Sequence, residues 1–135
     1  MFWLHHVVMK NHPLVPDDIE QKYDVREWRN GLAILATVRP GEWAEMLEVL
    51  RGFRLLRSDI VNPGGAKSDI AKKIDGHFTK LGWLEKQFDT KIVVDKTEYH
   101  TPTHKVDCYK NRVALEVEWN NKDPSFDRDL NNFRL

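Results

Sequence analysis

The chain has 135 residues, of which 41% are hydrophobic and 31% are charged, enough for one globular domain with its own core. Its 21 basic and 21 acidic residues balance, which disfavours a nucleic-acid-binding protein unless its positive side chains collect on one face. A single cysteine excludes a disulfide framework within the chain and favours a reducing, cytoplasmic setting.

The first residues carry no clear helix or strand pattern. Residues 1–9 are apolar but too short to cross a membrane, and they lack the basic start and cleavage site of a signal peptide. Residues 10–24 contain prolines and several acids and predict a loop. We therefore expect an N-terminal extension over residues 1–24, no association with a membrane, and one domain over residues 25–135.

Three helices are predicted next. Apolar positions favour helices over residues 25–38 and 40–52, the second with a proline at its start and a glycine at its end. Residues 62–65, Asn-Pro-Gly-Gly, interrupt the pattern. A third helix over about residues 68–81 follows, with apolar residues at helical spacing and Gly82 at its end.

Strands are predicted near residues 88–94, 103–109 and 113–119, followed by a helix that begins at Pro124. Three strands are few for a central sheet. Because the chain also stops at Leu135 within an apolar-striped helix, we expect a truncated polypeptide whose missing part holds further strands.

Three carboxylates gather near the predicted turn between the last two strands. Residues 113–119 alternate strictly, which places Glu116 and Glu118 on one face, roughly 6–7 Å apart. Folding back at Asn111 brings Asp107 close to Glu116. Carboxylates this close repel one another unless a cation lies between them. Because hard divalent cations prefer carboxylate oxygen, the cluster predicts a Mg²⁺ site.

A simpler interpretation of the paired glutamates stays open. An antiparallel sheet with one solvent-exposed face often carries Glu-x-Glu by chance. Lysine or arginine on a neighbouring strand then balances the charge of the glutamates.

Polar residues after the acids suit DNA. Asn120, Asn121 and Lys122 fall between the last strand and the helix at Pro124. Asparagine amides bond base edges, and a lysine beside a helix N-terminus suits phosphate. Lys67, next to a glycine turn and a helix start, is a second candidate for a phosphate contact. The alternatives are an ordinary loop and a solvated lysine.

Three passages of the chain carry a family resemblance; they are residues 64–71 with 88–91, residues 104–107 with 116–118, and residues 118–133. Together they resemble the BglII/BstYI group of type II restriction endonucleases, within the PD-(D/E)XK nuclease superfamily. The resemblance implies an α/β fold with a restriction-endonuclease-like core. In that fold, N-terminal helices precede a mixed central sheet flanked by helices.

The resemblance also implies an activity and its residues. The protein would be a homodimeric, Mg²⁺-dependent enzyme that cuts double-stranded DNA at a short palindrome. Asp107 and Glu116 would hold the metal, and Glu118 would stand where most of the superfamily has lysine. Glu85 is a candidate for a further acid, although a solvated charge is the alternative. A DNA-binding module without activity and a repair or junction nuclease of the same superfamily are the alternative functions.

Overall fold

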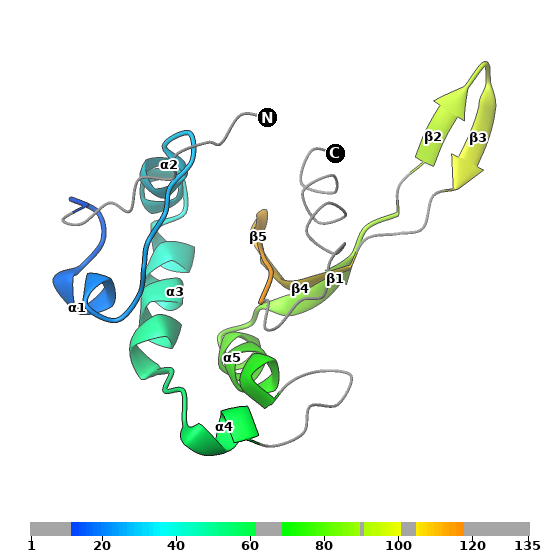
Figure 1. The fold of residues 1–135 in the computed structure, drawn as a ribbon. Coiled ribbons are helices and arrows are strands. Elements are labelled where there is room, and N and C mark those ends of the chain that lie inside the picture. The colour runs from blue at the N-terminus through cyan, green and yellow to red at the C-terminus, as the bar shows by residue number, and fades with distance from the viewer. Residues whose placement is uncertain (1–11, 62–68, 90, 101–104, 118–135) are drawn as a thin grey trace, which may run out of the picture. The chain divides into compact units, whose positions relative to one another are not determined.

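The computed structural model describes most of the chain, namely residues 12–61, 69–89, 91–100 and 105–117 (Figure 1). The described part contains five helices and five strands, which confirms the predicted mixture of helix and sheet. The chain divides into two compact units, an N-terminal unit over residues 1–54 and a C-terminal unit over residues 55–135.

The N-terminal unit holds three helices, which are α1 (Asp17–Glu20), α2 (Gly31–Val38) and α3 (Pro40–Gly52). Its buried core consists of Val15, Ile19 and Leu47. Partly buried residues pack against that core: Tyr23, Val25, Leu32, Trp43 and Leu50. The three helices therefore share apolar contacts with the segment that precedes them.

Two predictions for this unit need correction. Residues 10–24 were predicted as a loop, but α1 forms there because Ile19, only 2% exposed, anchors it in the core. The helix predicted over residues 25–38 begins only at Gly31. Arg29 and Asn30 have φ of 51° and 57°, left-handed values that interrupt a helix.

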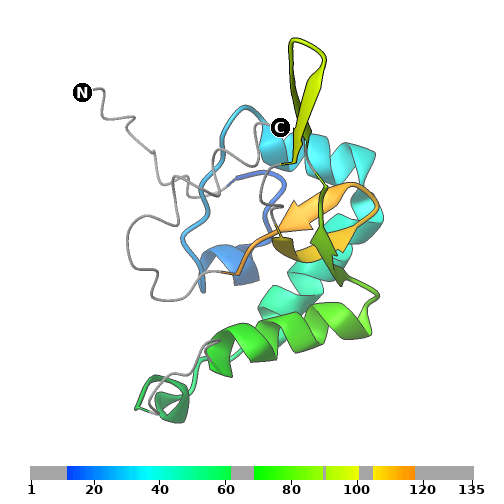
Figure 2. The same ribbon diagram turned by 90° about the vertical axis from the view of Figure 1, so that its right-hand side faces the viewer.

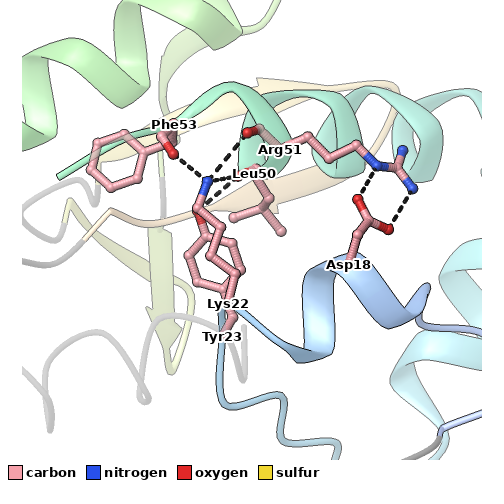
Figure 3. A network of polar contacts seen from close by, with 6 residues as sticks. All are labelled: Asp18, Lys22, Tyr23, Leu50, Arg51 and Phe53. Atoms are coloured by element: carbon pink, nitrogen blue, oxygen red, sulfur yellow. Dashed lines mark hydrogen bonds and ion pairs between the residues drawn. The ribbon is translucent and has the colours of Figure 1, made fainter.

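The C-terminal end of α3 is closed by side chains from the segment after α1 (Figure 3). The Lys22 ammonium donates to the carbonyl oxygens of Leu50 at 2.9 Å, Arg51 at 3.2 Å and Phe53. The Tyr23 hydroxyl donates to the Leu50 carbonyl at 2.8 Å. The last carbonyls of a helix lack partners within it, so a cation there satisfies them and complements the helix dipole.

An ion pair joins α1 to the same turn of α3. Arg51 Nε donates to Asp18 Oδ2 at 2.6 Å, which Figure 3 shows beside the Lys22 contacts. This hydrogen bond holds the pKa of Asp18 below its ordinary value. Both side chains are about half exposed, so the pair contributes little to stability and mainly orients the helix ends.

The C-terminal unit begins with α4 (Arg57–Val61) and α5 (Asp69–Lys80). In the described residues α5 matches the third predicted helix, whose predicted start at Ser68 lies outside them. Asp59 on α4 accepts a hydrogen bond from the Leu56 N–H at 2.8 Å and forms an ion pair with Lys73 on α5. These contacts tie the two helices together.

Five strands follow α5. An antiparallel sheet is formed by β1 (Leu84–Gln87), β4 (Lys105–Lys110) and β5 (Val113–Leu115), in the order β1-β4-β5. A separate antiparallel hairpin is formed by β2 (Lys91–Val94) and β3 (Thr97–His100).

The predicted strand over residues 88–94 is therefore wrong in its start, and β1 and β3 were not predicted. The turn between β2 and β3 is formed by Asp95 and Lys96, with φ of 48° and 75°. No glycine marks that turn in the sequence, although its conformation is the one that glycine adopts most easily.

The two faces of β4 differ. Val106 and Cys108 are buried, and α5 packs against this strand (Figure 1). Trp83, fully buried between α5 and β1, contacts Phe78 edge to face at a centroid distance of 5.3 Å. The alternate residues Asp107 and Tyr109 are only partly buried and lie on the opposite face. The core of the unit thus lies on the α5 side of the sheet.

A two-residue turn joins β4 to β5 (Figure 2). Asn111 and Arg112 have φ of 47° and 69°, as a type I′ turn requires. Such turns match the twist of the flanking strands. Asparagine tolerates the left-handed region, whereas arginine is strained there.

Arg112→Gly should increase the free energy of unfolding by about 1 kcal/mol, because glycine adopts this φ without strain. Denaturant unfolding followed by circular dichroism measures the change. Arg54→Gly is the matched control, since Arg54 is exposed and has no left-handed φ. A loss of stability in Arg112→Gly equal to that of the control would contradict the assigned turn.

Asp59→Asn should destabilise the protein at neutral pH and have no effect at strongly acidic pH. The ion pair with Lys73, followed by the bond from Leu56, holds the pKa of Asp59 below its ordinary 3.8. A carboxyl with a lowered pKa in the folded state contributes stability above the unfolded pKa and loses it as the pH falls through the folded pKa. Denaturant unfolding at both pH values tests this, with exposed Asp24→Asn as the control.

Candidate functional site

The register of the β4–β5 hairpin places two of the predicted acids side by side. Residue pairs across it are Cys108 with Leu115, Tyr109 with Ala114, and Lys110 with Val113. β5 ends at Leu115, and one further step along the same register would set Asp107 opposite Glu116. Directly opposed residues of antiparallel strands share a face, so both side chains lie on the face opposite to buried Cys108.

Two hydrogen bonds connect these residues. The Asp107 backbone N–H donates to Glu116 Oε2 at 3.3 Å, and the Val117 backbone N–H donates to Asp107 Oδ2 at 3.1 Å. Asp107 and Glu116 are both partly buried. The structure therefore brings together the two residues that we predicted as metal ligands, with their carboxylates held by backbone donors.

The two backbone donors stabilise the carboxylates of this pair. A backbone N–H carries a partial positive charge, and its bond to a carboxylate is stronger than one between neutral groups. Two ionised carboxylates placed this close together would repel each other. A cation bound between Asp107 and Glu116 would remove that repulsion.

The donor set fits Mg²⁺. Both groups offer hard carboxylate oxygens, and Mg²⁺ in nucleotide-processing sites commonly takes one or two carboxylates together with phosphate oxygens and water. Within the part of the chain that the structure describes, no third histidine, cysteine or acid joins Asp107 and Glu116 in a metal-binding group. The two carboxylates would therefore anchor the ion, and substrate and water would complete its coordination.

Glu85 lies on β1 and is exposed. Its Oε1 atom is 2.7 Å from the Lys105 Nζ atom, so the carboxylate already has a cationic partner on the adjacent strand. For Glu85 we therefore adopt the alternative given above, a solvated charge, and the assignment as a further active-site acid stays an untested prediction. The remaining predicted site residues lie outside the described residues; they are Glu118, Asn120, Asn121, Lys122 and Lys67.

One feature at the site was not predicted. Pairing between β1 and β4 slips by one residue, so that Asp107 and Cys108 together face Glu85 alone. Cys108 is 1% exposed, and its Sγ atom lies 3.9 Å from Asp75 Oδ1 on α5. The sequences of β1 and β4 do not indicate this slip, because neither strand contains the glycine or proline that often marks a bulge.

Comparison with known proteins gives one match. A family model described as "Restriction endonuclease BglII/BglIII" matches residues 23–135, which include Asp107, Glu116 and Glu85. Neither the search of curated proteins nor the search of solved structures returned a match. Among the described residues, no helix is both long and apolar enough to span a bilayer.

Mg²⁺ should stabilise the protein against thermal unfolding, by about 2.7 kcal/mol at 100 times its dissociation constant. Glu116→Gln should abolish most of this effect, because it removes one charge of the pair while keeping an oxygen for the Asp107 N–H. Glu85→Gln is the matched control and should retain the full shift. The metal assignment is wrong if Glu116→Gln responds to Mg²⁺ as strongly as the unaltered protein does.

Proposed function

Because the chain belongs to the BglII/BglIII family of restriction endonucleases, we propose that it is a type II enzyme that hydrolyses double-stranded DNA at a short palindrome. The activity would depend on Mg²⁺ bound by Asp107 and Glu116. The observation that carries this proposal is the contact between these two residues across β4 and β5. It places two hard oxygen ligands together inside the segment that matches the nuclease family.

The metal would act on the phosphodiester and on water. When bound, Mg²⁺ supplies Lewis-acid polarisation of a phosphate oxygen and a lower pKa for bound water. Asp107 and Glu116 would hold the ion with their carboxylates. The backbone N–H of Val117 donates to Asp107 Oδ2 at 3.1 Å, which fixes the orientation of this carboxylate.

Glu118 is proposed to orient the attacking water or to accept its proton. The strand predicted over residues 113–119 ends at Leu115, and Glu118 lies outside the described residues. Water attack needs no covalent intermediate with the protein. The proton leaves with a carboxylate, and the leaving 3′ or 5′ oxygen of the DNA takes a proton from solvent.

DNA recognition is assigned to residues beyond the acids. Asn120 and Asn121 would bond base edges, while Lys122 and Lys67 would contact phosphates. A homodimer would present two such sets to a palindrome, because a two-fold axis in the protein matches the two-fold symmetry of the DNA sequence.

Plasmid cleavage in Mg²⁺, with the product ends sequenced, tests the function. The unaltered protein should give fragments with one common end sequence. Asp107→Asn and Glu116→Gln should each lower the rate by at least about 100-fold, since loss of a group that merely supports a metal ligand already costs roughly 10–100-fold. Glu85→Gln should cut at nearly the normal rate.

Other results would support other functions. Fragment ends that follow branched or damaged DNA, without a common sequence, would indicate a repair or junction nuclease. DNA binding that is independent of Mg²⁺, together with intact plasmid in every condition, would indicate a binding module. Equal cleavage by the unaltered protein and by Glu116→Gln would exclude Glu116 as a metal ligand.

A further inference from the structure

The slip between β1 and β4 is a β-bulge located at the predicted metal site. The pairs on either side of it are Leu84 with Tyr109, then Lys86 with Val106 and Gln87 with Lys105. One residue of β1, Glu85, lies between these pairs, whereas β4 has two, Asp107 and Cys108. The extra residue therefore belongs to β4, the strand that carries Asp107. A bulge of this kind interrupts the ladder and redirects the side chains next to it.

The direction expected for the Asp107 N–H follows from the turn at the other edge. In a hairpin with a two-residue turn, the residues that flank the turn, Lys110 and Val113, form a hydrogen-bonded pair. Hydrogen-bonded and non-bonded pairs alternate, so in a regular ladder the later pair, Asp107 with Glu116, would be non-bonded and the Asp107 N–H would point towards β1. At the bulge this N–H instead donates to Glu116 Oε2 at 3.3 Å.

A second backbone donor is diverted in the same way. β5 ends at Leu115, and Val117 has the N–H that would continue the ladder with β4 beyond that point. Instead, the Val117 N–H donates to Asp107 Oδ2 at 3.1 Å. Two backbone N–H groups thus bind the two carboxylates of the candidate metal site.

The burial of the residues on both sides of Asp107 explains why the bulge in β4 forms at this position. Val106 and Cys108 are 3% and 1% exposed, and moving either of them out of the core would expose an apolar side chain. Cys108 also contacts Asp75 on α5. Because the residues on both sides of Asp107 are held in the core, Asp107 is the position where β4 can deviate.

We propose that the β4 bulge opposite Glu85 positions the metal site, by directing the Asp107 N–H to Glu116 and holding both carboxylates ready for the ion. This inference rests on the proposed Mg²⁺-dependent function. Glu85 is the single residue of β1 that faces the bulge. The proposal depends on the position of Glu85 in β1 and not on its side chain.

An alanine inserted after Glu85 tests the proposal, because it sets two residues of β1 opposite the two of β4. Isothermal titration with Mn²⁺ and Mg²⁺, without DNA, should show affinity weakened by about 10–100-fold, as for loss of groups that orient metal ligands. The matched control is Glu85→Ala, which removes the side chain and its contact with Lys105 but keeps the register. Its affinity should stay within about twofold of normal.

Nuclear magnetic resonance of the unaltered protein provides a test that does not require the insertion to fold. The amide resonances of Asp107 and Val117 should both shift during a Mg²⁺ titration, because the carboxylates they bind turn to the ion. Amide resonances that stay unchanged while the metal binds would overturn the proposal. Normal metal affinity in the folded insertion variant, or a loss in Glu85→Ala equal to that of the insertion, would do the same.

The outcomes separate this inference from the proposed function. A protein that binds metal, loses affinity on the insertion and cuts no DNA would retain the role of the bulge and lose the nuclease assignment. A protein that cuts DNA normally with the inserted alanine would keep the nuclease function and exclude the bulge as its positioning element.

Discussion

The turn at Asn111 and Arg112 sets the register on which the candidate site depends. Two left-handed residues close the hairpin and pair Cys108 with Leu115, next to which Asp107 and Glu116 are in contact. A strand alternates its side chains with a period of two, so a slip of one residue would move one acid to the buried face. Arg112 adopts a strained left-handed conformation at this turn, because the pairing of β4 with β5 offsets the cost of that conformation.

The two faces of the sheet have different roles. On one face, Val106 and Cys108 are buried against the side of the unit that contains α5, and they hold β4 in place. On the other face, Asp107 and Glu116 are partly buried and bound by backbone N–H groups. Burial of the apolar face stabilises β4, which carries Asp107 on its other face. The proposed metal ion would compensate the repulsion between the two carboxylates.

Long helices and the short hairpin followed from local patterns. The helices α3 and α5 lie where apolar spacing and terminal glycines predicted them, because such signals act within a few residues. The elements α1, α4, β1 and β3 were missed. Two of them show why. α1 exists because Ile19 reaches the core beside α3, and β3 follows a turn without glycine. Both depend on contacts or conformations that residue types in the segment do not signal.

The amino-acid order alone was enough to indicate the nuclease family and the approach of Asp107 to Glu116, since both rest on motifs and on a turn spanning few residues. The bulge could be found only from the folded chain. It arises from the pairing of β1 with β4, which are separated along the chain by β2 and β3. Pairing between distant strands is decided by which side chains are buried together, and here Val106 and Cys108 enter the core and leave Asp107 as the extra residue between them.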